Sequence, residues 1–185
     1  MKKIFIAVLS VIMAMSLVAC EKKKEVVKGN DKVNQEQEVK KEGKIDLSKI
    51  ELNKGNVEKL IKQILGANKI RAVTVNDSDI SIKLFQEPED EKQFLIHTSN
   101  YFIDIVSELF KNKKVENIEF IVDSIFDTKQ NEKVESRAIA YTITREKYNK
   151  FNWEDIKLQV YSEPKILYDL LDSAAVHPSI INNIK

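Results

Sequence analysis

The chain has few of the residues that most often perform chemistry in proteins. Its 185 residues include one cysteine and two histidines, His97 and His177. A zinc site needs several cysteine or histidine ligands at short spacings, and no such set occurs. A calcium-binding EF-hand loop starting at Asp77 would need a glycine and a glutamate where the chain has Ile82 and Pro88. The sequence therefore predicts no metal centre and no other cofactor.

Glycine is also scarce, and all four glycines precede residue 67. Loops that bind phosphate and sharp turns that hold a nucleophilic serine both depend on glycine. Carboxylates are abundant, but their positions suit other roles. The acidic residues within 87–91 are typical of the start of a helix, and Glu116, Glu119 and Asp123 of a solvated strand. We therefore predict no catalytic residue and favour a protein that is not an enzyme, with paired carboxylates acting on a glycan as the alternative.

Neither basic charge nor arginine is in excess. The chain has 30 basic and 29 acidic residues, and only three of the basic ones are arginines. A nucleic-acid-binding protein usually presents a basic patch, in which arginine reads phosphates and guanine. The composition therefore predicts no nucleic-acid partner. The abundance of lysine, isoleucine and asparagine is typical of an A+T-rich genome and hints at a Gram-positive source.

What the sequence does contain begins at its first residues. Lys2 and Lys3 are followed by an apolar run of 16 residues, from Ile4 to Ala19, that is interrupted only by serines. As a helix this run would be roughly 24 Å long, which is short of the roughly 20 residues needed to span a bilayer. A basic start, a short apolar run and a small residue at its end are typical of a signal peptide. We predict a signal peptide over residues 1–19.

The end of that run, Leu17-Val18-Ala19-Cys20, resembles the lipobox of bacterial lipoproteins. The resemblance implies cleavage between Ala19 and Cys20 and attachment of diacylglycerol to the thiol of Cys20, with palmitate-type acyl chains as the membrane anchor. Two acyl chains suffice for stable anchoring. The mature protein is thus expected on the outer face of a cell membrane, in the outer leaflet of a Gram-positive cell or facing the periplasm of a Gram-negative one.

The segment 20–46 differs in composition from the remainder of the mature chain. It has no aromatic residue, and lysines alternate with acidic residues along it. Such a segment buries too little apolar surface to offset the entropy of ordering it. We predict a disordered tether over 20–46, which as a coil would reach roughly 25–30 Å, and a single domain over 47–185.

Within the domain, hydrophobic periodicity predicts alternating helices and strands. Asn56 is the expected N-cap of the first helix and Gly66 its stop. Asn76 to Asp79 predict a turn. In chain order, we expect a helix over 56–65, strands over 70–75 and 80–85, a long helix over 87–111, strands over 115–126 and 134–145, and a helix from about 163 to 171.

This order, α-ββ-α-ββ-α, predicts an α+β fold with an antiparallel sheet of about four strands packed against the long helix. Leu95, Phe102, Ile105, Val106 and Leu109 lie on one side of that helix. In the last strand either the face of Tyr141 or the face of Ala138 must meet it. The other face of the sheet then either exposes isoleucine and tyrosine or is covered by the C-terminal segment around Trp153 and Tyr161, and we favour cover.

The sequence thus predicts an exported lipoprotein with a non-catalytic module that binds a protein or cell-envelope ligand. Two alternatives stay open: a carboxylate-dependent envelope hydrolase, and a surface exclusion or immunity lipoprotein of a mobile element. The predicted site residues are Cys20 for lipid attachment and Ala19 with Cys20 for cleavage.

Overall fold

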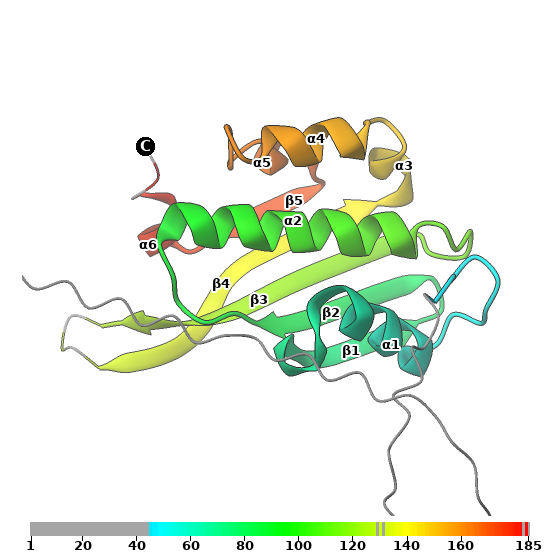
Figure 1. Ribbon diagram of the computed structural model, residues 1–185, viewed down its shortest axis with the longest axis horizontal. Coiled ribbons are helices and arrows are strands. Elements are labelled where there is room, and N and C mark those ends of the chain that lie inside the picture. Colours follow the sequence, from blue (N-terminus) through cyan, green and yellow to red (C-terminus); the bar gives the residue numbers. More distant parts are fainter. Residues whose placement is uncertain (1–44, 129, 131, 183, 185) are drawn as a thin grey trace, which may run out of the picture. The chain divides into compact units, whose positions relative to one another are not determined.

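The computed structural model describes residues 45–128, 130, 132–182 and 184 (Figure 1). The predicted signal peptide, Ala19, Cys20 and all but the last two residues of the predicted tether lie outside the described residues. Within the described part, none of the helices is long and apolar enough to cross a membrane.

The described residues form one α+β domain with a five-stranded sheet in the order β1-β2-β3-β4-β5. The strands are β1 (Ile70–Asn76), β2 (Asp79–Phe85), β3 (Asn117–Asp127), β4 (Lys133–Thr144) and β5 (Ser173–Val176). All neighbours pair antiparallel except β2 and β3, which are parallel. The prediction of about four antiparallel strands therefore needs two corrections. A long helix returns the chain from the end of β2 to the start of β3, and such a crossover produces a parallel pair. The second correction is β5, a short strand on the edge beside β4.

The helices lie in one layer against the sheet (Figure 1). They are α1 (Lys54–Leu65), a 3-10 turn η1 (Ala67–Lys69), α2 (Glu91–Leu109), α3 (Arg145–Tyr148), α4 (Trp153–Gln159), α5 (Leu167–Leu170) and α6 (Pro178–Ile181). α2 is the central helix and contacts α1, α4 and α6. The predicted last helix over 163–171 is reduced to the single turn of α5.

Side-chain caps set where the two longest helices begin. Asn53, not Asn56, caps α1: its side chain accepts a hydrogen bond from the Asn56 backbone N–H at 3.0 Å. Asp90 caps α2 by accepting from the N–H groups of Lys92 and Gln93. α2 therefore starts after Pro88 rather than at residue 87. Gly66 ends α1 as predicted, with a φ of 83° that suits glycine.

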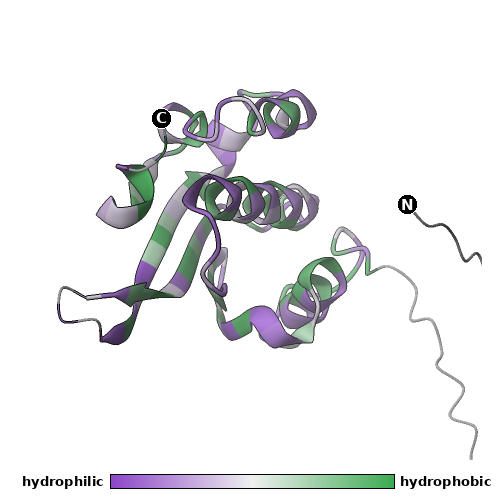
Figure 2. Cartoon of the chain, turned by 60° about the vertical axis from the view of Figure 1, so that its left-hand side comes forward, coloured by the Kyte–Doolittle hydropathy of each residue, from purple (hydrophilic) through white to green (hydrophobic). Residues whose placement is uncertain are grey.

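The core lies between α2 and the sheet. All five residues predicted for the buried side of α2 are buried. The ring of Phe102 meets Phe120 of β3 and Tyr141 of β4 edge-on, with centroids 5.6 and 5.3 Å apart. Hydrophobic and hydrophilic residues alternate along the strands (Figure 2). The contact between Tyr141 and Phe102 shows that the face of Tyr141 meets the helix. Ala138, next to a bulge in β4, is buried in the same core.

The C-terminal segment lies on the same side of the sheet as α2, which corrects the expectation that it covers the other face. Trp153 contacts Phe102 at 6.3 Å, and Phe102 faces the core. Tyr161 is 57% exposed. The face of the sheet opposite α2, called the open face below, carries the intervening residues of the strands, among them Lys83, Ile121 and Asp123.

Candidate functional site

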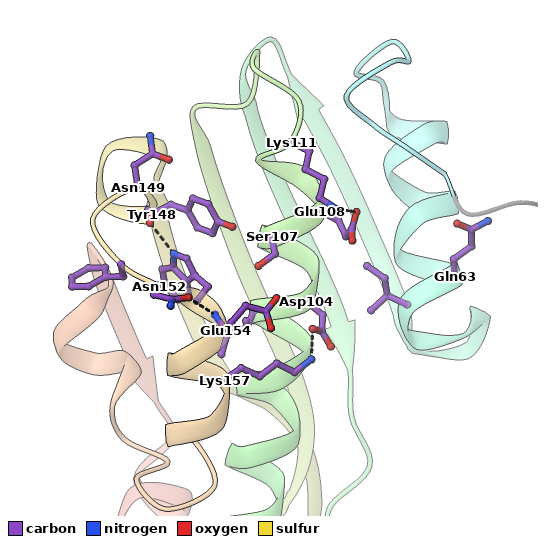
Figure 3. Close-up of a pocket in the computed structure, with 14 residues that line it drawn as sticks. Gln63, Asp104, Ser107, Glu108, Lys111, Tyr148, Asn149, Asn152, Glu154 and Lys157 are labelled. Atoms are coloured by element: carbon purple, nitrogen blue, oxygen red, sulfur yellow. Dashed lines mark hydrogen bonds and ion pairs between the residues drawn. The ribbon is translucent and has the colours of Figure 1, made fainter.

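The outer side of α2 forms the floor of a groove of about 720 Å³, with α1 along one side and the α3–α4 segment along the other (Figure 3). Asp104, Ser107 and Glu108 of α2 line it, together with Lys111, which follows the end of this helix. Ser107 and Glu108 follow Asp104 by three and four residues, which places these three side chains on one side of the helix. The buried residues of α2 take the opposite side, so the amphipathic pattern that builds the core also supplies this polar stripe.

An aromatic cluster supports the α3–α4 wall of the groove. The rings of Tyr148 and Trp153 stack with centroids 5.2 Å apart and planes 6° apart. The indole N–H of Trp153 donates to the carbonyl of Tyr148 at 2.8 Å. Phe110 and Phe151 add further ring contacts. Because Trp153 is only 6% exposed, the cluster fixes the wall and offers the groove little open aromatic surface.

Polar side chains from the floor and from the α3–α4 wall point into the space between α2 and the α3–α4 segment. Figure 3 shows the Tyr148 hydroxyl directed toward α2, the Ser107 hydroxyl directed toward α3–α4, and the Glu154 carboxylate reaching from α4 toward α2. Among the described residues, neither hydroxyl has a hydrogen-bond partner and Glu154 has no ion pair. These three groups are therefore available to a ligand.

The other charged groups of the groove are already paired. Lys157 of α4 bridges to the carboxylate of Asp104 on α2 (Figure 3). Lys111 binds Glu108 one turn earlier on α2 at 2.8 Å. Both pairs are partly exposed, so each contributes at most about 1 kcal/mol to stability. Their main effect is to hold these side chains in place along the groove.

Arg145 joins the end of α2 to the start of the aromatic wall. Its guanidinium donates to the carbonyls of Val115, Phe110 and Asn112 at 2.7, 3.1 and 2.6 Å. Carbonyls at the C-terminal end of a helix lack partners within the helix and favour a nearby cation. Arg145 satisfies the carbonyl of Phe110 at the end of α2, and it also binds the carbonyls of Asn112 and Val115 in the connection that follows the helix.

The two histidines lie away from the groove. Nδ1 of His97 is 3.0 Å from the Glu89 carboxylate. His177 caps α6, where its Nδ1 accepts from the Ser179 N–H, and its ring stacks on Phe126 at 4.0 Å. Over the described residues, no group of three or more histidine, cysteine or acidic side chains could hold a metal ion.

The sequence analysis did not predict the groove. The aromatic residues Tyr148, Phe151 and Trp153 are close together in the chain and the long helix is amphipathic, but neither pattern alone indicates a groove. The two segments are far apart in the chain, and tertiary contacts such as those of Trp153 with Phe102 and of Lys157 with Asp104 bring them together. Glu154 gave no signal of its own.

Comparisons with known proteins suggest no function for this groove, so its interpretation rests on its geometry. No family model, no curated protein and no solved structure matches the chain. The fold and site define a class in structural terms: a small α+β domain with a polar groove across its helical layer.

Proposed function

We propose that this chain is an exported, lipid-anchored lipoprotein whose domain binds a cell-envelope ligand in the groove over α2. The lipobox-like stretch ending at Cys20 supports export and anchoring. The observation that carries the binding role is the groove itself, which is lined by two hydroxyls and a carboxylate that have no partner among the described residues.

The paired carboxylates favour binding over catalysis. A general acid or a nucleophile must be free to exchange a proton or to attack the substrate. Asp104 and Glu108 are each held by a lysine. Groups fixed in this way present hydrogen-bonding atoms at set positions, which suits recognition of a polar ligand.

The binding role is tested by blocking the groove on intact cells. Ser107→Phe places a ring between the two walls, and Thr74→Phe places the same ring on the exposed open face. After cross-linking, Ser107→Phe should lose the captured envelope component, while Thr74→Phe should retain it. Capture of the same component by both variants, each with an unchanged circular-dichroism spectrum, would refute the groove as the binding site.

The anchor is tested separately. Cys20→Ser removes the only thiol of the chain, so the variant should move from the membrane fraction to the medium or periplasm. The wild-type protein should stay with the membrane after a carbonate wash. A variant that also stays bound would show that lipid on Cys20 is not the anchor.

One observation favours a second candidate, a carboxylate-dependent hydrolase of envelope glycans. Asp104, Glu108 and Glu154 line the same groove, and glycosidases act through a pair of carboxylates. A hydrolase would release new reducing ends from purified cell-wall glycan, and Glu154→Gln would abolish that release. If the domain only binds glycan, neither the wild-type protein nor Glu154→Gln should release reducing ends.

A further inference from the structure

The three groups of the groove that are unpaired among the described residues can all accept hydrogen bonds, which indicates a ligand that donates them. Glu154, Ser107 and Tyr148 come from α4, α2 and α3, and their oxygen atoms point into the same space (Figure 3). All three can accept a hydrogen bond. A primary ammonium group has three N–H donors and no acceptor, so it matches a set of three oxygens that includes one negative charge.

The charge balance of the groove points the same way. Its lining includes three carboxylates and two lysines. Both lysines are engaged, Lys157 by Asp104 and Lys111 by Glu108, which leaves Glu154 as the uncompensated charge. Glu154 is not required to start α4, because the side chain of Asn152 caps that helix and Asp155 binds the Asn152 amide at 2.7 Å.

The walls indicate what carries the ammonium group. An amine on an aliphatic stem, such as a lysine side chain, packs its methylenes against apolar surface. Here the lining beside the three oxygens carries more polar than apolar side chains, and Asn149 and Asn152 are among the polar ones, while Ile103 and Phe151 are apolar. The indole of Trp153 is buried under its neighbours. A hydroxyl-rich carrier can hydrogen-bond to these polar side chains, which a hydrocarbon stem cannot do.

We infer that the ligand of the groove is a glycan with a free, unacetylated amino group, and that Glu154, Ser107 and Tyr148 receive this group. The inference rests on the proposed binding function and specifies the ligand class for that site. Acetylation of the amine removes its charge and two of its three donors, so the groove discriminates against the acetylated sugar.

The chain contains its own probe for a test. Trp153 is the only tryptophan, and it lines the groove. The full-length protein, purified in detergent, is titrated with a tetramer of glucosamine and with the same tetramer fully N-acetylated, while tryptophan fluorescence is recorded. We expect the free-amine tetramer to bind at least about tenfold more tightly, as one charge-assisted hydrogen bond predicts.

Two variants assign that difference to the proposed residues. Glu154→Gln keeps the shape and removes the charge, and should reduce the preference to about twofold or less. Glu163→Gln, an exposed glutamate beyond the end of α4, should keep it in full. Thermal unfolding checks that both variants are folded. If both variants lose the preference for the free-amine tetramer, or if both keep it, the proposed role of Glu154 is wrong.

The remaining outcomes separate this inference from the proposed function. Equal affinity for the two tetramers would overturn the amino-sugar inference and leave the groove as a glycan site. Tighter binding of Nα-acetyl-lysine amide than of the glucosamine tetramer would show that the ligand is not a glycan, and that the groove binds the amine of a peptide. Absence of any fluorescence change would overturn the inference, while the blocking experiment with Ser107→Phe decides the binding function independently.

Discussion

The two faces of the sheet are built from alternate residues of the same strands, yet different forces stabilise them. On the helix face, the buried rings of Phe102, Phe120 and Tyr141 contact one another. On the open face, neighbouring strands are linked by charged and polar pairs. Lys83 Nζ of β2 lies 2.7 Å from the Asp123 carboxylate of β3.

Further pairs extend this pattern along the open face. Ser81 donates to the Glu119 carboxylate at 2.7 Å, and Arg71 lies 3.6 Å from Glu135 while its guanidinium covers the Phe85 ring. Ile121 is on this face with an exposed fraction of 8%. A strand face can thus be satisfied by its own long side chains, without a second layer of helices.

The largest effect should come from the helix face. Phe102→Ala removes the ring that joins α2, the sheet and Trp153, and should lower the free energy of unfolding by about 3–5 kcal/mol. Ile121→Ala on the open face should cost less, about 1–2 kcal/mol, because no second layer of the described residues packs on it. Urea unfolding followed by circular dichroism measures both. Equal losses would mean that the two faces are packed alike.

The next effect concerns the end of α2. Arg145→Met removes three hydrogen bonds to backbone carbonyls and should cost about 2–3 kcal/mol. Arg137→Met is the matched control, because Arg137 is exposed on the open face, and it should change stability by less than about 0.5 kcal/mol. If the two arginine variants unfold at the same urea concentration, Arg145 does not hold the end of the helix.

Two tyrosines on the helix side make stability depend on pH. Burial raises the pKa of Tyr141, which is fully buried, and burial raises the pKa of Tyr168 to about 12. In the unfolded chain both ionise near pH 10, so above that pH the folded state holds more protons than the unfolded state.

Stability should therefore be complete below about pH 10 and fall as the pH rises further, by about 1.4 kcal/mol per pH unit for each such tyrosine. Tyr141→Phe should remove the contribution of this fully buried tyrosine, so that the free energy of unfolding falls less steeply with pH. Urea midpoints measured from about pH 9 to about pH 11, on either side of the unfolded-state pKa, test this. An unchanged slope in the variant would show that Tyr141 does not contribute.

The smallest effects should come from the ion pairs of the open face. Lys83→Met leaves the buried carboxylate of Asp123 without its cation and should cost about 1 kcal/mol. Arg71→Met breaks a pair in which both side chains are about half exposed, and should cost less than that. Added salt should weaken the effect of Arg71→Met more than that of Lys83→Met. The opposite order would mean that Asp123 is well solvated.

Local patterns predicted most of the elements but not how they combine. The two hairpins, α1 and α2 follow from hydrophobic periodicity and turn residues within short windows. β5 was missed because Ser173–Val176 is four residues long and mostly small. The parallel pairing of β2 with β3 depends on how α2 packs, which periodicity does not encode. A bulge between Ile139 and Arg137, opposite Val122 and Asp123, also shifts which residues of β4 face the core.

The candidate site was less predictable than the fold. The polar stripe on α2 could be read from the sequence as an ordinary solvated helix face. The polar stripe becomes the floor of a groove only because Trp153 and Glu154 lie beside it. Their placement depends on tertiary contacts between distant segments, such as the contact of Lys157 with Asp104, 53 residues earlier in the chain. The role of Cys20, by contrast, is predicted from a local motif, which needs no fold to be recognised, and it stays a prediction because Cys20 lies outside the described residues.

The parallel pairing at the centre of the sheet has a consequence for how the domain assembles. β1–β2 and β3–β4 are hairpins between neighbouring segments, and such hairpins form in about 1–10 μs. β2 meets β3 across a separation of 38 residues, so the chain must close a long loop before this pairing contributes any energy. We expect the two hairpins to form early and independently. The pairing of β2 with β3, which forms as α2 packs on the sheet, is then the step that limits the folding rate of the domain.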